Sequence, residues 1–371
     1  MTNIVIILKI GENYGGAERR FARLFKLVSL ELKYRLTLII QGDDLHINKF
    51  LVEYSLDENL IIFRSKNVIS TKKIMNEIDI DILHLVAVNT SFFPLYLKLK
   101  LSKRKFKIVL SLNSYELCTG IYKNLLQKIT FYLLISLVNS IDCLYPSYVN
   151  ILKQRFHRIN PKIKYFYPNN SFTDLEKYKP NISKDKLIVF ASRLIEQKNP
   201  LIALDSIISC KSFLRDRGYR FIIAGDGLLK KKLESIVSNE FVFDIVQIVG
   251  NIDTSNIVAS SRLFLSLQTI ENYPSQSLLE AISSGNFIIA TNVGDTKRIV
   301  KDEFGLLVDL NKESIVKAVI NAIELIDNDL EMDDISKKSR DFALLNFDIK
   351  DYANHITTLW QKVDISNESR D

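Results

Sequence analysis

Two cations in one short segment have the chemistry to hold a diphosphate. The segment SRLIEQKNP follows the apolar run Leu187–Ala191 and carries Arg193 and Lys198. The apolar run predicts a buried strand, and the pair Asn199 and Pro200 predicts a capped helix start. Arg193 and Lys198 would then lie between a strand end and a helix start, where both can approach an anionic ligand. The alternative is a solvated loop that happens to carry two cations.

A second segment, between Leu263 and Val300, carries two glutamates. Apolar runs predict strands at Leu263–Leu267 and Phe287–Ala290, and a polar loop and a short helix lie between them. Ligands of parallel sheets bind at the carboxyl ends of the strands. We therefore expect Glu271 and Gly294, which follow these two strands, on one rim of the sheet.

The start of the short helix offers a structural alternative for its glutamate. Ser277 and Glu280 have the S-x-x-E spacing of a capping box, in which the serine bonds a free helix amide and the glutamate reaches back to the cap. A helix N-terminus also holds phosphate groups through its free amides. Capping and ligand binding are therefore compatible at this helix start.

The sequence ENYPSQSLLEA in this segment resembles the nucleotide-sugar-binding segment of retaining glycosyltransferases with two Rossmann-like domains, the GT-B fold of the family 4 type. The resemblance implies that Glu271 meets the hydroxyls of the transferred sugar and that Glu280 meets the ribose. Eight residues separate the two glutamates, where the family has seven, and this places Asn272 in the standard register. The resemblance makes Glu271 a catalytic candidate, and the donor-binding candidates of the segment are Glu271, Asn272, Ser275, Gln276, Ser277 and Glu280.

Other short motifs follow in the family's order. RLxxxKNP is similar to the family's donor-diphosphate clamp, which implies catalytic and donor-binding roles for Arg193 and Lys198. The GDG turn that begins at Gly225 is similar to a turn that faces the donor, and Gly250 stands where relatives hold the base. GGAER, near the N-terminus, is similar to the family's first loop, so Gly16 is a further donor-binding candidate.

We expect neither a metal site nor a cofactor. Asp79 and Asp81 form a D-x-D motif, but they precede the apolar run Ile82–Val88 instead of ending a strand, so we interpret them as a polar strand entry. The cysteines, Cys118, Cys143 and Cys210, lack metal-ligand spacing and do not suggest a disulfide framework.

The first half departs from the family pattern at one position. Relatives often carry a histidine after the strand that ends near Leu112, close to the reacting sugar. This chain has Asn113 and Glu116 in that stretch and no histidine, so one of these two residues is expected in its place. His84, within the preceding strand, is expected to be structural.

Length and pattern predict two α/β domains. At about 150 residues per domain, 371 residues suggest two. Alternating strands and helices, together with the resemblance, predict two Rossmann-like domains that face each other across a cleft. We expect an acceptor-side domain at 1–168, a linker at 169–186 and a nucleotide-sugar-binding domain at 187–349. The final helix, within 350–371, either crosses back to the first domain or ends the second.

Charge is divided unevenly along the chain. Residues 1–180 hold 27 Lys and Arg against 15 Asp and Glu, whereas the remainder holds 23 against 28. A basic half suggests an anionic partner. No nucleic-acid-binding motif is present, so we expect a membrane surface or a polyanionic acceptor, with the cation-rich run 98–107 as the contact. A solvated helix end is the alternative for that run.

These observations predict a glycosyltransferase that moves a sugar from a nucleotide diphosphate sugar, UDP-linked, to a glycan or lipid-linked acceptor in cell-surface polysaccharide synthesis. The N-terminal run MTNIVIILKI reads as a strand rather than a signal peptide, so we expect a cytoplasmic protein at the inner face of the membrane. Retention of configuration is implied by the resemblance alone. The alternatives are a nucleotide-sugar epimerase of the same fold and a non-catalytic partner subunit.

Overall fold

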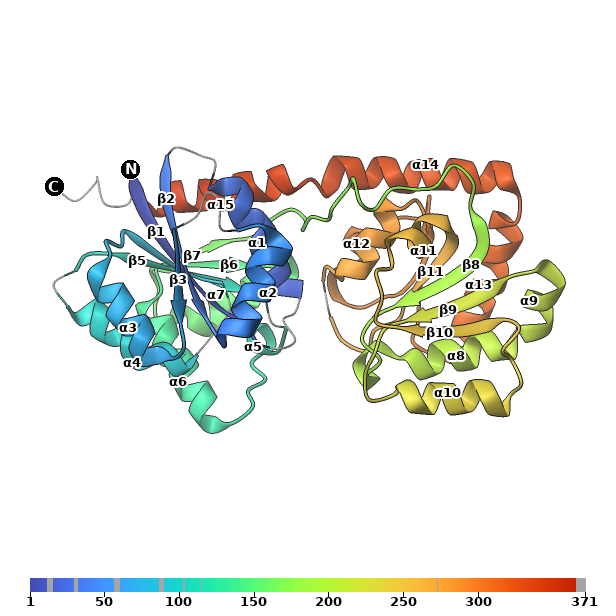
Figure 1. Cartoon of the computed structure of the whole chain (residues 1–371), viewed down its shortest axis with the longest axis horizontal. Coiled ribbons are helices and arrows are strands. Elements are labelled where there is room, and N and C mark those ends of the chain that lie inside the picture. Colours follow the sequence, from blue (N-terminus) through green and yellow to red (C-terminus); the bar gives the residue numbers. More distant parts are fainter. Residues whose placement is uncertain are drawn as a thin grey trace. The chain divides into compact units, whose positions relative to one another are not determined.

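The chain folds into two compact units, each built on one parallel sheet (Figure 1). The structure is a computed structural model, and it describes residues 1–11, 16–29, 33–56, 61–86, 90–102, 104–113, 115–271 and 273–364. The first unit comprises Met1–Asn169 and Lys350–Asp371, and the second comprises Asn170–Ile349. The expected α/β fold with parallel sheets is thereby confirmed.

The sheet of the first unit has the strand order β3-β2-β1-β4-β5-β6-β7. Its strands are β1 (Thr2–Lys9), β2 (Tyr34–Gln41), β3 (Ile61–Ser65), β4 (Ile82–Leu85), β5 (Lys107–Leu112), β6 (Ser140–Cys143) and β7 (Lys164–Phe166). The helices are α1 (Gly16–Val28), α2 (Asp44–Tyr54), α3 (Val68–Glu77), α4 (Phe93–Leu101), α5 (Tyr115–Thr119), α6 (Leu125–Leu137), α7 (Val149–His157) and α15 (Ile349–Asp364), with 3-10 turns η1 (Thr90–Phe92) and η2 (Pro146–Tyr148).

The C-terminal helix α15 completes the core of the first unit. Trp360 of α15 is fully buried, and its Nε1 donates to Nδ1 of His84 at 3.2 Å. His355 Nε2 lies 2.8 Å from Asp142 Oδ1, and Thr2 Oγ1 donates to Asp364 Oδ2 at 2.7 Å. Of the two placements open from the sequence, the structure therefore has this helix on the first unit.

The sheet of the second unit has the strand order β10-β9-β8-β11-β12-β13. Its strands are β8 (Asp185–Ala191), β9 (Arg220–Ala224), β10 (Val246–Gly250), β11 (Ser261–Ser266), β12 (Phe287–Thr291) and β13 (Gly305–Val308). The helices are α8 (Pro200–Ser209), α9 (Lys211–Arg217), α10 (Lys230–Asn239), α11 (Ser255–Ser260), α12 (Gln276–Ser283), α13 (Lys312–Ile326) and α14 (Asp329–Asn346), with 3-10 turns η3 (Glu196–Lys198) and η4 (Gly294–Arg298).

The strand order of this second sheet fixes where a ligand would bind. The chain runs outward from β8 through β9 to β10, and it then crosses to the other side of β8 to form β11. The loops after β8 and β11 consequently leave the same edge of the sheet in opposite directions. Such a reversal of strand order is where open α/β sheets hold their ligands.

The stretch 169–186, expected as a linker, does not form a separate segment. From Asn170 onward it belongs to the second unit. Phe172 and Tyr178 are buried, and Lys184 donates to the carbonyl oxygens of Ala259, Ser261 and Ser284. The polar composition of this stretch gave no sign of the packing, because the partners of its side chains come from distant parts of the chain.

Candidate donor site on the second unit

The loops after β8 and β11 are joined by hydrogen bonds at the reversal point. Lys198 Nζ donates to Gln268 Oε1 at 2.8 Å, and the amide of Thr269 donates to the carbonyl of Gln197 at 3.2 Å. Asn199 stands before α8, but the prediction that its side chain caps this helix is wrong. That side chain bonds Thr269 Oγ1 at 2.9 Å instead, because the neighbouring loop lies within its reach.

The ammonium group of Lys198 is held in a desolvated, positively charged place. Burial, and then the nearby Arg193 guanidinium, lower the pKa of Lys198 to about 8. Arg193 itself is exposed. Two cations kept close together in this way repel each other, and a bound dianion would relieve that repulsion. The pair predicted as a diphosphate clamp is thus brought together at the reversal point.

Glycines allow the loops after β9 and β10 to approach the loop after β8. Gly225 has φ 141°, and a Cβ there would overlap the carbonyl oxygen of Ser192. The amide of Leu194 donates to the carbonyl of Asp226 at 2.8 Å, and the amide of Gly225 donates to the carbonyl of Gly250 at 2.6 Å. The turns after β8, β9 and β10 therefore pack backbone to backbone, and at Gly225 only a residue without a Cβ permits the approach.

Glu271 lies on the rim with Gly294, as expected from the sequence. Its side chain is 4% exposed, and the amide of Asp295 donates to both carboxylate oxygens, at 2.9 Å to Oε1 and 3.0 Å to Oε2. A Cβ at Gly294 would overlap this carboxylate. Burial raises the pKa of Glu271 to about 7, the Asp295 amide opposes this shift, and the Asp295 carboxylate adds to it. Its contact with a sugar hydroxyl stays a prediction.

The remaining residues of this segment form the start of α12. The helix begins at Gln276 with Ser275 at the cap position, so Ser277 lies inside the first turn and not at the cap position that the structural alternative gave it. Ser275 Oγ lies 3.3 Å from Ser277 Oγ, and Gln276 Nε2 donates to Thr173 Oγ1 at 3.1 Å. Glu280 is half-buried in the second turn of the helix. Asn272 lies outside the described residues.

Three residues of this site were not predicted from the sequence. Gln268 accepts from Lys198, Thr291 Oγ1 accepts from the amide of Gln268 at 2.8 Å, and the Asp295 amide holds Glu271. Each lies at the end of a strand or the start of a 3-10 turn next to a predicted site residue. The rule that parallel strand ends share one edge could have indicated Gln268 and Thr291.

The first unit contributes less to the description of the site. Gly16 is the first residue of α1, and residues 12–15 before it lie outside the described part of the chain. Asn113 Nδ2 donates to the carbonyl of Val86 at 2.8 Å, so this side chain ties the ends of two strands together. Glu116 is exposed on α5. Which of them replaces the histidine of relatives stays a prediction.

The motifs interpreted as structural are structural here. Asp81 Oδ2 accepts from the amide of Asn3 at 2.7 Å, which confirms a polar strand entry. His84 is fully buried, and its Nε2 lies 2.9 Å from Ser111 Oγ, which in turn donates to Asp142 Oδ2 at 3.1 Å. This serine lies between the histidine and the aspartate, and this is not the order of a hydrolytic triad, in which the histidine stands between the two.

The cysteines are free and buried. Cys118 and Cys143 are 25 residues apart in the sequence, and the fold brings their Sγ atoms to 3.9 Å from each other. Among the described residues, no group of three or more His, Cys, Asp or Glu side chains is placed to hold a metal ion. No helix in the described part of the chain is long and apolar enough to cross a membrane.

The cation-rich run 98–107 divides into two kinds of residue. The Arg104 guanidinium donates to the carbonyl oxygens of Met75, at 2.6 Å, and Ile78, and so closes the end of α3. Lys100 Nζ donates to the carbonyl of Phe106 at 2.9 Å. Lys98 and Lys105 are exposed. Arg104 and Lys100 thus have structural partners, whereas Lys98 and Lys105 extend into solvent.

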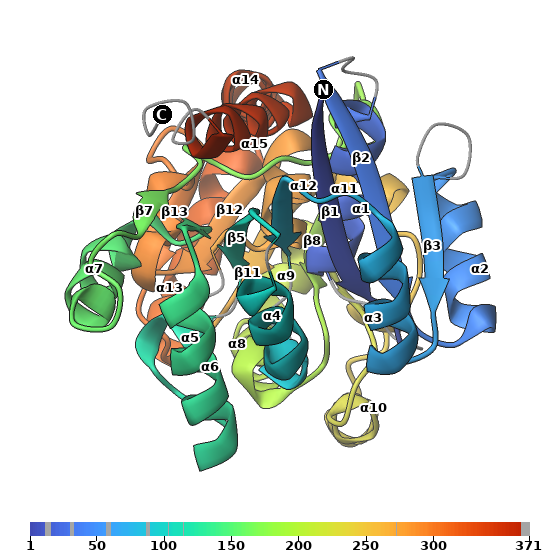
Figure 2. The ribbon, with the colours of Figure 1, turned by 90° about the vertical axis from the view of Figure 1, so that its left-hand side faces the viewer.

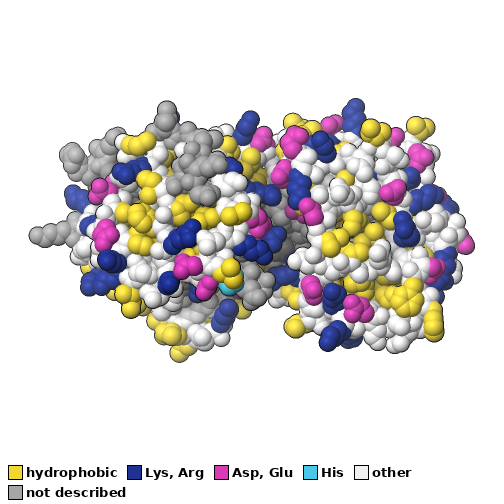
Figure 3. All heavy atoms as spheres, in the orientation of Figure 1, with side chains coloured by type: hydrophobic (Ala, Val, Ile, Leu, Met, Phe, Trp, Pro, Cys, Tyr) yellow, Lys and Arg dark blue, Asp and Glu magenta, His cyan; other side chains and the backbone are white. Residues whose placement is uncertain are grey.

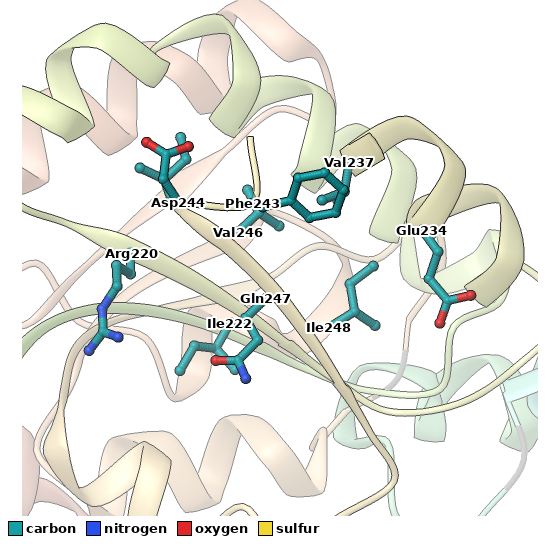
Figure 4. Close-up of a pocket in the computed structure, with 10 residues that line it drawn as sticks. Arg220, Ile222, Glu234, Val237, Phe243, Asp244, Val246, Gln247 and Ile248 are labelled. Atoms are coloured by element: carbon teal, nitrogen blue, oxygen red, sulfur yellow. The ribbon is translucent and has the colours of Figure 1, made fainter. Parts of the chain in front are cut away.

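A pocket of about 440 Å³ lies elsewhere on the second unit (Figure 4). It is lined by the body of β9 and β10 and by α10, with Ile222, Val246 and Glu234 among its residues. None of the predicted donor-binding residues lines it. This pocket therefore does not correspond to the candidate donor site, which lies at the ends of the strands.

The comparisons with known proteins bear on the same segment. Residues 172–341 match the family model described as glycosyl transferases group 1. The match covers slightly less than half of the chain, and over these residues the chain is similar to a group 1 glycosyltransferase domain. Lys198, Gln268 and Glu271 all fall inside the matched residues.

Relatives and solved structures agree with this assignment. A Campylobacter jejuni protein, named as an N-acetylgalactosaminyltransferase that acts on a glycan linked to undecaprenol diphosphate, is 24% identical over 218 residues. The match spans 57% of this chain and 56% of that relative's length. Anabaena HepE, solved with UDP and glucose, superposes with a TM-score of 0.75 at 15% identity, over 97% of this chain and 99% of its own.

A second solved structure gives the same result for the fold. The pneumococcal O-GlcNAc transferase GtfA, solved with UDP and GlcNAc, has a TM-score of 0.74 at 13% identity, over 98% of this chain and 99% of its own. The fold of the chain is therefore that of the GT-B glycosyltransferases.

Proposed function

We propose that this protein moves a sugar from a UDP-linked sugar donor to a lipid-linked glycan acceptor in cell-surface polysaccharide synthesis. The observation that carries the proposal is the pairing of Lys198 with Gln268 at the reversal of strand order, beside Arg193. A desolvated lysine beside an exposed arginine at that place matches a ligand with a diphosphate group.

The donor and acceptor classes are inferred from similar proteins. Anabaena HepE and pneumococcal GtfA were both solved with UDP and a sugar, which supports a UDP-sugar donor. The name of the Campylobacter relative supports an acceptor that is a glycan on a lipid diphosphate carrier. Such an acceptor lies at a membrane, so we place the reaction at the inner face of the membrane, with Lys98 and Lys105 near anionic lipid.

The proposed chemistry is stabilisation of the leaving group. As the bond between sugar and phosphate lengthens, negative charge builds on the diphosphate, and preplaced cations lower the energy of that state. Arg193 and Lys198 supply these cations, so we propose transfer without a divalent metal ion. Retention of the anomeric configuration belongs to the same proposal and rests on the family resemblance. We propose that Glu280 contacts the ribose. Glu271 contacts the transferred sugar or holds the turn that contains Asp295.

The first experiment identifies the donor and tests the cation pair. A thermal-shift screen with nucleotide sugars should reveal the donor, since a ligand at 100 times its Kd adds about 2.7 kcal/mol to the free energy of unfolding. Transfer to a lipid-linked acceptor should then persist in EDTA. Lys198→Ala should lose about 10²-fold in kcat, and Arg193→Lys should also lose activity, because a bidentate fork becomes a point charge.

A matched control is available on the same unit. Lys211 makes a surface ion pair with Glu240, 3.2 Å between Nζ and Oε2, so Lys211→Ala should leave turnover unchanged. Transfer that stops on chelation and returns with magnesium or manganese would refute the metal-free mechanism. Conversion of the donor without any acceptor would identify an epimerase instead. Donor binding without turnover would identify a partner subunit.

A further inference from the structure

A long stretch of the first unit is almost free of negative charge. Between Ile82 and Thr173 the sequence holds thirteen Lys and Arg, and its only acidic residues are Glu116 and Asp142. Asp142 is 1% exposed and bonds Ser111 and His355. The solvent-facing charge of this stretch is therefore almost entirely positive, which favours a partner with a dense negative surface.

The helix α6 in this stretch exposes apolar side chains to solvent. The exposed fraction is 70% for Leu125, 69% for Leu126, 48% for Ile129 and 43% for Leu133. Leu125, Ile129 and Leu133 are four residues apart, so they form one stripe along the helix, and Leu126 lies beside it. With Ile121 of the preceding loop, 57% exposed, these five residues are called the α6 surface.

The opposite side of α6 anchors the helix to the unit. Phe131, Leu134 and Ile135 are fully buried, and the ring of Phe131 packs against that of Phe156 of α7 at 5.9 Å between centroids. The helix is thus held firmly in place while it exposes a second apolar side. A contiguous exposed apolar area of this kind marks a contact with another molecule or a membrane.

Cations surround the α6 surface. α4 packs beside α6 (Figure 2) and ends in Leu101, which is 77% exposed. The exposed lysines on and around the two helices are Lys98, Lys105, Lys123 and Lys128, and in the described part of the chain none of them forms an ion pair. Lys98 lies so close to Lys72 of α3 that it lowers the pKa of Lys72 through a hydrogen bond and charge repulsion. Hydrophobic side chains also gather at the lower margin of the first unit in Figure 3, where Figure 1 places α6.

We infer that the α6 surface inserts into the headgroup region of an anionic membrane. An apolar face framed by lysines is the pattern of a helix that lies in the plane of the interface. Thirteen residues make a helix of about 20 Å, too short to span the hydrocarbon core of about 30 Å. A protein partner would explain the leucines, but it gives no reason for an almost complete lack of acidic residues over the whole stretch.

This inference adds a membrane-binding surface to the proposed function. It rests on the proposed function only for the reason why the protein would act at a membrane. Vesicle binding requires neither donor nor acceptor, and UDP binding requires no vesicle. The two can therefore fail separately. A variant of the α6 surface should lose lipid and keep its affinity for UDP.

Vesicle co-sedimentation of the full chain tests the inference. The wild type should bind vesicles of phosphatidylglycerol and phosphatidylcholine, and it should bind pure phosphatidylcholine far more weakly. The double variant Leu126→Gln with Ile129→Gln should lose about 100-fold or more in partition coefficient, because each apolar side chain contributes about tenfold on leaving water. Leu330→Gln with Leu345→Gln is the matched control, since these leucines of α14 are 80% and 79% exposed.

A fluorescence measurement reports insertion directly. Trp360 is the single tryptophan of the chain and is fully buried, so Ile129→Trp adds one reporter on the α6 surface. Its emission should shift to the blue with anionic vesicles and be quenched by brominated lipid chains. Vesicle binding that is unaltered by the two glutamines would overturn the inference. So would a wild-type dimer that these glutamines split into monomers, because the α6 surface would then be a protein interface.

Discussion

The substitution Lys198→Met tests two effects of this buried cation separately: its unfavourable contribution to folding and its contribution to donor binding. The side chain of methionine has nearly the length of lysine and no charge. In the wild type, burial and Arg193 lower the pKa of Lys198 to about 8 from an ordinary value of 10.5. Folding therefore disfavours the protonated form at neutral pH. Removing the charge should weaken donor binding and, at the same time, relieve the folded state of that cost.

The size of the effect follows from the pKa shift. Lowering the pKa of Lys198 from 10.5 to about 8 corresponds to roughly 3 kcal/mol against the protonated folded state at pH 7. Methionine leaves Gln268 Oε1 without its donor, and Gln268 is 8% exposed, which costs about 1–3 kcal/mol. We therefore expect the variant to lie between equal stability and about 2 kcal/mol more stable than the wild type at pH 7.

The pH dependence makes this prediction specific. Between pH 8 and 10.5 the unfolded chain binds the proton of Lys198 and the folded chain does not, so wild-type stability rises with pH over that window. From pH 7 to 10 this contribution amounts to roughly 2 kcal/mol. The methionine variant lacks it. The advantage of the variant should accordingly shrink or reverse by pH 10.

Calorimetric melting at pH 7 and pH 10 is the assay, with and without UDP. UDP should shift the transition of the second unit in the wild type and shift it less in the variant. Lys211→Met is the control, since loss of its surface pair with Glu240 should change stability by less than about 1 kcal/mol at either pH. A methionine variant that is destabilised equally at both values of pH would refute the reasoning.

Three further outcomes are expected. Glu280→Ala should weaken UDP binding in calorimetry, whereas Glu271→Gln should keep its affinity for UDP and lose turnover. Equal UDP affinity in the wild type and both variants would leave Glu280 without a role in the donor site. Gly294→Ala should lower the melting temperature, because its Cβ would overlap the Glu271 carboxylate and overpacking costs about 1–3 kcal/mol; an unchanged melting temperature would contradict the described turn. Burial lowers the pKa of His84 to about 4. As the pH falls from 6.5 to 4, His84 therefore takes up its proton in the unfolded chain before it does so in the folded chain. The free energy of unfolding of the first unit should fall by roughly 3 kcal/mol over that range. Urea titration followed by Trp360 fluorescence checks this loss, and stability that does not fall over that range would contradict it.

Much of the donor site could be predicted because its signals are local. Apolar runs located the ends of β8, β11 and β12, and parallel strands bring such ends to one edge. Arg193 and Lys198 were found by their place between a strand and a helix. Glu271 and Gly294 were placed on one rim for the same reason, and the Glu271 carboxylate does lie against that turn.

The failures arise from contacts between distant residues. Asn199 has the type and position of a helix cap, yet Thr269, 70 residues away, takes its side chain. The stretch from Asn170 has the composition of a linker, yet Lys184 finds three carbonyl oxygens up to 100 residues away. The sequence of α6 is largely apolar, and only the packing reveals that one side of the helix faces solvent. Local pattern cannot supply such partners.

The unusual spacing of Glu271 and Glu280 illustrates where an extra residue can be accommodated. An extra residue inside α12 would turn every later side chain by about 100°, and Glu280 would then exchange places with residues of the buried face. That face is intact, with Leu278, Leu279 and Ile282 all buried, and the helix starts only at Gln276. We therefore expect the longer spacing to be taken up before the helix rather than inside it. On this expectation Glu280 would keep the helical position that the resemblance assigns to the ribose contact, and this assignment stays a prediction.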